Sequence, residues 1–131
     1  MEPRKGVMGI IKKENKILLG IEAKDTPYHG MWRLLGGKLE GNETHAEAMV
    51  RETKEEADID IKVIKFIGRV QGTVNDVMID ICVTEWLKGD IKPNAREFKE
   101  LRWFTLEEAK PLKKDPVTEQ FFKVYEKIIK P

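Results

Sequence analysis

The segment at residues 34–59, LLGGKLEGNETHAEAMVRETKEEADI, contains a sharply marked helix start behind a pair of glycines. Thr44 and Glu47 form a capping box, in which the hydroxyl and the carboxylate each accept a hydrogen bond from an otherwise unpaired backbone N–H. Apolar or small residues then recur at helical spacing, namely Ala46, Met49, Val50, Thr53 and Ala57. The segment therefore predicts a Gly36-Gly37 turn followed by a helix that packs these side chains inward.

Strand-like patterns lie on both sides of the predicted helix. They occupy residues 6–13, 16–22, 31–35, 61–72, 77–87 and 100–104. Turn candidates separate two pairs of these strands, at Glu14-Asn15 and at Asn75-Asp76. Strands interrupted by one central helix predict a mixed β-sheet.

Two further helices are predicted toward the C-terminus. Thr105 with Glu108 forms a second capping box for a brief helix. Asp115-Pro116 supplies an N-cap and a first residue for a longer one. Its residues expected to face inward are Val117, Phe121, Val124, Tyr125 and Ile128. We therefore expect one α+β domain over residues 1–131, with the mixed β-sheet sandwiched between helices.

The composition argues against several classes of protein. A net charge of +1 is not that of a strongly basic nucleic-acid binder, so no nucleic-acid polymer is expected as a partner. No stretch approaches the roughly 18 apolar residues of a membrane span, and no signal-peptide core is recognisable. Cys82 is the only cysteine, which excludes an internal disulfide and favours a cytoplasmic location. We expect a monomer or a homodimer without a membrane partner.

Acidic residues are concentrated in and around the predicted central helix. Residues 36–60 contain eight acids against Lys38, Arg51 and Lys54, a local charge of −5 that leaves +6 for the remainder. An asymmetry of this size in a nearly neutral chain calls for a physical cause.

Three of these acids, Glu52, Glu55 and Glu56, share one helix face, which we expect to be the open face. Like-charge neighbours cost about 0.2–0.5 kcal/mol per pair, so a solvated acidic surface is one interpretation. The other is a site for a hard cation, because carboxylates suit Mg²⁺ or Mn²⁺ and the nearby glycines let a backbone carbonyl approach a ligand. A divalent cation would also explain the asymmetry of charge.

The spacing of these residues resembles the signature of the Nudix hydrolase family. The matching positions, which delimit a Nudix box over residues 37–59, are Gly37, Glu43, Arg51, Glu52, Glu55, Glu56 and Ile59. Thr53 stands where the family has an aliphatic residue, and Asp58 where it has a glycine. Neither departure replaces a carboxylate, and Asp tolerates the positive φ of a helix end better than most residues do.

The resemblance implies an enzyme that uses a divalent metal to hydrolyse a nucleoside diphosphate linked to another moiety. Glu52, Glu55 and Glu56 would hold Mg²⁺, with Mn²⁺ as an alternative. The Gly36 carbonyl would be a further ligand. Glu52 or Glu55 would deprotonate the attacking water, and Arg51 would orient a catalytic glutamate. An ordinary ion pair with a glutamate four residues away is the other role open to the arginine.

Members of the family often draw one more acidic ligand from a position shortly before a Trp on a late strand. Glu97, six residues before Trp103, is the expected ligand, and Glu100 is the competitor. Glu43 is expected to brace the loop rather than to bind metal.

Substrate contacts are expected at Lys38, Arg33 and Asp115. Lys38 follows the glycines and would touch a phosphate, with a solvent-exposed lysine as the alternative. Arg33 sits where animal oxidised-purine triphosphatases place an asparagine that reads the base, and an arginine there can bind a guanine edge or a phosphate. Asp115 lies near the position of a purine-binding group, and its alternative role is the helix N-cap.

The sequence GMWRLLGGKLEGNET resembles the MutT-like branch of the family, which cleaves nucleoside triphosphates, including oxidised purine forms, to monophosphate and pyrophosphate. We therefore expect a small-molecule nucleotide as the substrate. ADP-ribose or a dinucleoside polyphosphate is the alternative within the family. A catalytically silent nucleotide-binding domain is the alternative of another class, and the retention of every box glutamate argues against it.

Overall fold

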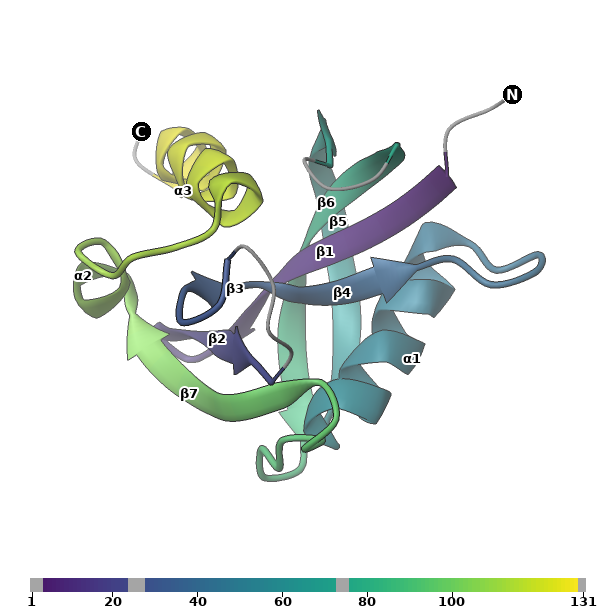
Figure 1. The fold of residues 1–131 in the computed structure, drawn as a ribbon. Helices are drawn as coiled ribbons and strands as arrows, with labels where there is room; N and C mark the ends of the chain where they lie inside the picture. Colours follow the sequence, from purple (N-terminus) through teal and green to yellow (C-terminus); the bar gives the residue numbers. More distant parts are fainter. Residues whose placement is uncertain (1–3, 24–27, 73–75, 130–131) are drawn as a thin grey trace.

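The computed structural model describes residues 4–23, 28–72 and 76–129, which form seven strands and three helices (Figure 1). The strands are β1 (Arg4–Lys13), β2 (Lys16–Glu22), β3 (Trp32–Arg33), β4 (Leu35–Lys38), β5 (Asp60–Gln71), β6 (Val77–Lys88) and β7 (Phe98–Thr105). The helices are α1 (His45–Ala57), α2 (Leu106–Ala109) and α3 (Pro116–Ile129). Of the two turn candidates between strands, the turn at Glu14-Asn15 is present, with Glu14 at a positive φ of 57°. Asn75, in the second candidate, lies outside the described residues.

The strands form one mixed sheet, as predicted. Its order is β3-β2-β1-β6-β5, while β4 pairs with β1 and β7 pairs with β2. Strands β1 and β6 run parallel, and the other pairs are antiparallel. Parallel neighbours need a long crossover connection, and the chain between β1 and β6 includes α1. The central helix is thereby placed against the sheet.

The glycine pair lies inside a strand, so the prediction of a turn at this position is wrong. Gly36 and Gly37 belong to β4 and pair with Met8 and Val7 of β1. A Cβ atom on Gly36 would lie 2.0 Å from the backbone oxygen of Val7. Glycine is needed here because two backbones approach closely. The predicted strand 31–35 is divided at Leu34 between β3 and β4.

Two hydrophobic cores lie on opposite faces of the sheet, one beneath α1 and one beneath α3 (Figure 1). Alternate residues of β1 serve both, because successive side chains of a strand point to opposite faces. Val7 and Ile11 belong to the core that includes Met49 of α1, whereas Met8 and Ile10 belong to the core that includes Phe121 of α3. The predicted α+β architecture, a sheet between helices, is confirmed.

Helix α1 begins as predicted but presents a rotated face to the core. The capping box is confirmed, and the helix ends at Asp58 in the left-handed conformation, with φ 58° and ψ 36°. Its buried residues are Ala48, Met49, Thr53, Glu56 and Ala57. The inward stripe was therefore wrong at Val50, which is 39% exposed, and at the half-buried Ala46. Glu56 and Ala48, which were not predicted to face inward, are buried instead.

The C-terminal elements follow the prediction closely. The second capping box, formed by Thr105 and Glu108, is present at the start of α2. Asp115 precedes α3, and its Oδ1 accepts a hydrogen bond from the Thr118 N–H at 2.8 Å. Val117, Phe121 and Tyr125 are buried and Val124 is half-buried, while the side chain of Ile128 lies outside the described part of the chain.

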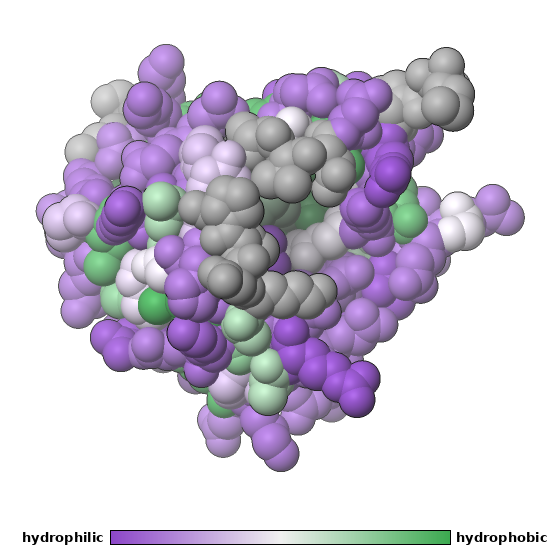
Figure 2. All heavy atoms as spheres, in the orientation of Figure 1, coloured by the Kyte–Doolittle hydropathy of each residue, from purple (hydrophilic) through white to green (hydrophobic). Residues whose placement is uncertain are grey.

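Hydrophilic residues cover most of the face drawn in Figure 2, in keeping with a sequence in which 36% of the residues are charged. The same face is hollowed near its centre, where apolar residues are visible. Among the described helices, none is both long enough and apolar enough to cross a bilayer.

Candidate active site

The two glycines of β4 bring two glutamates of α1 against a strand backbone. A Cβ atom on Gly37 would lie 2.4 Å from Cδ of Glu52, so a larger residue here would displace this carboxylate from its position. The backbone N–H of Gly36 donates a hydrogen bond to Oε1 of Glu56 at 3.1 Å. Local structure explains the arrangement, because the Thr44 cap fixes where α1 begins and hence which residues reach β4.

Glu56 is buried in this arrangement, and its side chain is not on an open helix face. The residue is only 3% exposed, so the expectation that all three glutamates share an open face is wrong for Glu56. Burial raises the pKa of its carboxyl to about 8, and the negative charges of Glu52 and Glu97 act in the same direction. The positive charge of Arg33 and the Gly36 N–H oppose this increase. Burial is tolerated because these two groups partly replace water.

Glu52 is partly buried and Glu55 is open to solvent. The side chain of Glu52 is 17% exposed and that of Glu55 is 55% exposed. Burial raises the pKa of Glu52, while the hydrogen bond from Arg51 lowers it. Glu55 and Glu97 add further repulsion. Glu52 therefore belongs to a set of acids whose charges are mutually unfavourable.

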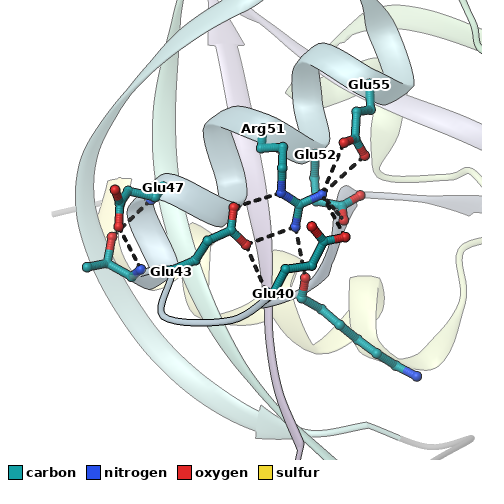
Figure 3. Close-up of polar contacts among 8 residues, drawn as sticks. Glu40, Glu43, Glu47, Arg51, Glu52 and Glu55 are labelled. Atoms are coloured by element: carbon teal, nitrogen blue, oxygen red, sulfur yellow. Dashed lines mark hydrogen bonds and ion pairs between the residues drawn. The ribbon is translucent and has the colours of Figure 1, made fainter.

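Arg51 is the centre of a hydrogen-bond network that holds two of these acids (Figure 3). Its Nη1 donates to Oε1 of Glu52 at 3.0 Å and to Oε2 of Glu55 at 3.1 Å. Its Nε and Nη2 donate to the two carboxylate oxygens of Glu43 at 2.7 and 3.0 Å, and Nη2 also donates to the Lys38 carbonyl at 3.1 Å. These bonds raise the pKa of the guanidinium, so it remains charged.

Glu43 braces the loop between β4 and α1. Besides both bonds from Arg51, its Oε1 accepts the backbone N–H of Glu40 at 2.8 Å. The pKa of Glu43 is lowered, first by the hydrogen bond from Arg51 and then by that from the Glu40 backbone. The loop and the guanidinium are thus fixed to each other.

Of the two late acids, Glu97 lies close enough to repel the box glutamates. It contributes to the raised pKa of both Glu52 and Glu56. Its carbonyl accepts a hydrogen bond from the Ala23 N–H at 2.9 Å, which attaches it to the end of β2. Glu100, the competing candidate, instead pairs with Arg102 on its own strand.

The three predicted substrate contacts belong to β3, β4 and the start of α3, and the Asp115 N–H donates to the carbonyl of Trp32, the neighbour of Arg33, at 3.1 Å. Arg33 lies against Phe98, with Cζ 4.9 Å from the ring centre, and its Nε is 3.0 Å from Oε1 of Glu22. That Nε is buried and is not aligned for a hydrogen bond. Lys38 is exposed, whereas Asp115 is buried at the start of α3, where it forms the helix N-cap.

Sequence reasoning missed two partners of the site. One is Glu22, which pairs with Arg33. No sequence pattern at the end of β2 predicts an ion pair with a residue that follows the next loop. The other is Asn94, which donates from Nδ2 to the Glu55 carbonyl at 3.2 Å. The Pro93-Asn94 pair is a turn signal, but its contact with α1 depends on the tertiary fold.

The chemistry of the site suits a hard divalent cation. Carboxylates of Glu52, Glu56 and Glu97 repel one another, and a cation would relieve that repulsion. Within the described ranges, no three acidic, histidine or cysteine side chains converge as a ready-made metal site. Instead, the carboxylates of Glu52 and Glu55 accept hydrogen bonds from the guanidinium of Arg51. The donor types therefore fit, and Glu52 and Glu55 would have to turn from Arg51 toward an ion.

Comparisons with known proteins identify a matching family model and several similar proteins. A family model described as NUDIX domain matches residues 2–125. An ADP-ribose pyrophosphatase of Methanocaldococcus jannaschii is 36% identical over 110 residues, which cover 81% of this chain and 64% of that protein. A CTP pyrophosphohydrolase of Escherichia coli is 32% identical over 105 residues, which cover 79% of this chain and 76% of that protein. An NAD-capped RNA hydrolase, NudC of Vibrio parahaemolyticus, is 28% identical over 102 residues, or 78% of this chain and 38% of that protein.

The chain thus matches less than two thirds of the length of the first and the last of these relatives. Solved structures give the same picture of the fold. A NUDIX hydrolase from Nitrosomonas europaea superposes with a TM-score of 0.85 and 27% identity, over 98% of this chain and 73% of that one. The Escherichia coli ORF135 protein superposes with a TM-score of 0.79 and 25% identity, over 100% of this chain and 95% of that one.

Proposed function

Because this chain belongs to the NUDIX family, we propose that it is a divalent-metal-dependent pyrophosphohydrolase acting on a nucleoside diphosphate linked to a further group. One observation carries the proposal: two glutamates of the Nudix box pack against the two glycines of β4. Glu52 lies over Gly37, and Glu56 accepts the Gly36 N–H. An acidic surface without a function would have no need to bury a carboxylate there.

The proposed metal is Mg²⁺, with Mn²⁺ as an alternative. Its ligands would be Gly36 through its carbonyl, together with Glu52, Glu55, Glu56 and Glu97 through their carboxylates. When bound, such an ion neutralises phosphate charge and makes a bound water more acidic.

The protein's own groups have distinct tasks in this proposal. In the metal-free protein Arg51 holds Glu52 and Glu55 on the same side of α1, because its other nitrogens are anchored by Glu43 and the Lys38 carbonyl, and the two carboxylates would turn from it to the ion. Glu52 or Glu55 takes the proton of the attacking water. The partial burial of Glu52 raises its pKa, which makes its carboxylate a stronger proton acceptor.

A (deoxy)nucleoside triphosphate, possessing an ordinary or an oxidised base, is the proposed substrate, and monophosphate and pyrophosphate are the products. The MutT-like sequence around β4 and the likeness to the CTP pyrophosphohydrolase support this choice. Lys38 can approach a phosphate without rearrangement because its side chain is exposed. Arg33 would first have to leave Glu22, and Asp115 would have to bind substrate while it caps α3.

ADP-ribose is the second candidate substrate. The relative from Methanocaldococcus jannaschii, 36% identical to this chain, carries the name of an ADP-ribose pyrophosphatase. Both candidates contain the same reactive element, a nucleoside diphosphate joined through an anhydride or ester oxygen. The box residues act on that element and leave the choice of the attached group to the surrounding loops.

A substrate panel tests the proposal. The protein is incubated with Mg²⁺ and nucleoside triphosphates, oxidised deoxynucleoside triphosphates, ADP-ribose, dinucleoside polyphosphates or NAD-capped RNA, and products are separated by ion-exchange chromatography. We expect turnover of a triphosphate, lost on addition of a chelator. The double variant Glu52→Gln with Glu56→Gln should lose activity by orders of magnitude, and Glu107→Gln, which changes an exposed glutamate on α2, is the matched control.

Three outcomes would contradict all or part of the proposal. Absence of turnover on every compound would remove the enzymatic function, and nucleotide binding without products would identify a silent binding domain instead. Full activity of the double variant would remove the metal assignment. Turnover of ADP-ribose alone would leave the reaction class standing and replace the substrate.

A further inference from the structure

The C-terminus of α1 is closed by a segment that is distant in sequence. A helix ends with four carbonyl groups that have no partner within it. In α1 all four accept hydrogen bonds, and they belong to Lys54, Glu55, Glu56 and Ala57. Asp58 supplies one donor, whereas Lys92 and Asn94, between β6 and β7, supply the other three. The end of the box helix is therefore attached to the connection that leads to Glu97.

Asn94 alone supplies two of these donors. Its side-chain Nδ2 donates to the Glu55 carbonyl at 3.2 Å, and its backbone N–H donates to the Glu56 carbonyl at 3.0 Å. The two residues that receive these bonds carry proposed metal-binding carboxylates. Any displacement of Asn94 would therefore shift the backbone of Glu55 and Glu56, which carries these side chains.

The acceptors of Asn94 hold the opposite side of the same connection. Its Oδ1 accepts the Arg96 N–H at 3.0 Å, and its carbonyl accepts the N–H groups of Glu97 and Phe98, each at 2.9 Å. Phe98 is 1% exposed and begins β7, so the turn is anchored in the core. The backbone of Glu97 is also held through its carbonyl by Ala23.

We propose that Asn94 is a positioning residue of the site, which sets the placement of Glu97 relative to the glutamates of α1 by bonding to both. The inference rests on the proposed metal-dependent function, because the placement of Glu97 matters to catalysis only if its carboxylate serves a metal. Asn94 itself touches neither metal nor substrate. Its effect passes through backbone groups of the helix on one side and of the turn on the other.

A purely structural role is the competing explanation, since bonding helix carbonyls stabilises a protein wherever it occurs. The two explanations differ in what they predict for metal affinity. A structural cap changes the free energy of unfolding and leaves the affinity of the folded protein for Mn²⁺ unchanged. A positioning residue changes that affinity as well, and only while Glu97 can act as a ligand.

The experiment measures Mn²⁺ binding in the absence of substrate, by electron paramagnetic resonance of free Mn²⁺. Asn94→Ala removes both side-chain bonds. Asn94→Ser keeps an oxygen that can accept the Arg96 N–H but is too short to reach the Glu55 carbonyl. Thr105→Ala, which removes the cap of α2, is the matched control with a comparable loss of stability and no connection to the acids.

We expect both Asn94 variants to bind Mn²⁺ about tenfold more weakly, the lower end of what loss of a residue supporting a metal ligand causes. Thr105→Ala should bind it as the unaltered protein does. In a Glu97→Gln background, Asn94→Ala should cause no further loss of affinity, because the two changes remove the same contribution. Thermal unfolding at matched pH checks that every variant is folded at the temperature of the titration.

The possible failures are distinguishable. If the unaltered protein binds no Mn²⁺ and turns over no substrate, the proposed function fails. If it binds Mn²⁺ and the Asn94 variants bind it equally well, only the positioning role fails. An equal further loss in the Glu97→Gln background would also overturn the inference, since Asn94 would then act on α1 alone.

Discussion

Replacement of Glu56 by glutamine should stabilise the metal-free protein, and increasingly so as the pH rises. Glu56 is 3% exposed, and burial raises the pKa of its carboxyl from 4.5 to about 8. Since one pKa unit corresponds to about 1.4 kcal/mol, this interval is equivalent to about 5 kcal/mol. Glutamine has nearly the same shape, can still accept the Gly36 N–H, and carries no charge.

The direction of the effect follows from proton binding in the two states. Below about pH 4.5 the carboxyl is protonated whether the protein is folded or unfolded, so ionisation of Glu56 contributes nothing. Between that pH and about 8 the unfolded state releases the proton while the folded state retains it, and the free energy of unfolding falls as the pH rises. Above about pH 8 the whole penalty is present.

Urea denaturation of metal-free protein at pH 5 and pH 8.5 measures this. We expect Glu56→Gln to differ little from the unaltered protein at pH 5 and to be more stable by about 3–5 kcal/mol at pH 8.5, the lower value allowing for an imperfectly bonded buried amide. Glu107→Gln, which changes an exposed side chain of α2, is the control and should leave the stability unchanged at both pH values. A Glu56→Gln protein that is equally stable or less stable at pH 8.5 would refute the burial of an ionisable, poorly compensated carboxylate.

Three further substitutions test details of the fold by urea or thermal unfolding. Thr53→Val should stabilise the protein by about 1 kcal/mol, because the buried Thr53 hydroxyl has no hydrogen-bond partner; a loss of stability would contradict this. Asp58→Gly should add about 0.5 kcal/mol, since Asp58 adopts the left-handed conformation with φ 58°; no gain would mean that its 3.4 Å pair with Lys54 compensates. Lys114→Met should cost about 3 kcal/mol, because its buried Nζ donates to three backbone carbonyls at 2.8 to 3.0 Å; a neutral result would exclude that role.

The parts of the fold that could be predicted from sequence are those determined by neighbouring residues. The capping boxes at Thr44 and Thr105 each involve groups three residues apart, so the sequence alone locates the two helix starts. The bounds of β2 were also predicted, because the strand follows a tight turn at Glu14. The spacing of the box acids likewise identified the family.

The errors concern features that depend on tertiary packing. Helical periodicity predicted a buried Val50 and an exposed Glu56, because the pattern assigns every glutamate to the solvent-facing side of a helix. The structure reverses the two, since Gly36 and Arg33 partly compensate the buried charge of Glu56. The glycine pair was similarly assigned to a turn, although its role is to let β4 approach β1 and α1 closely.

The burial of Glu56 lowers the stability of the metal-free protein, and binding of a cation would offset that cost. A carboxylate that is held dry, bonded to one N–H and repelled by Glu52 and Glu97, is costly in the metal-free state. An ion that binds the folded state alone stabilises that state by a free energy that rises with the logarithm of the ion concentration relative to its dissociation constant. The unfavourable burial of a carboxylate therefore lies where a cation would compensate its charge, and such local violations of packing rules are common at functional sites. A solvated acidic face would show no such conflict, because each of its charges would remain in water.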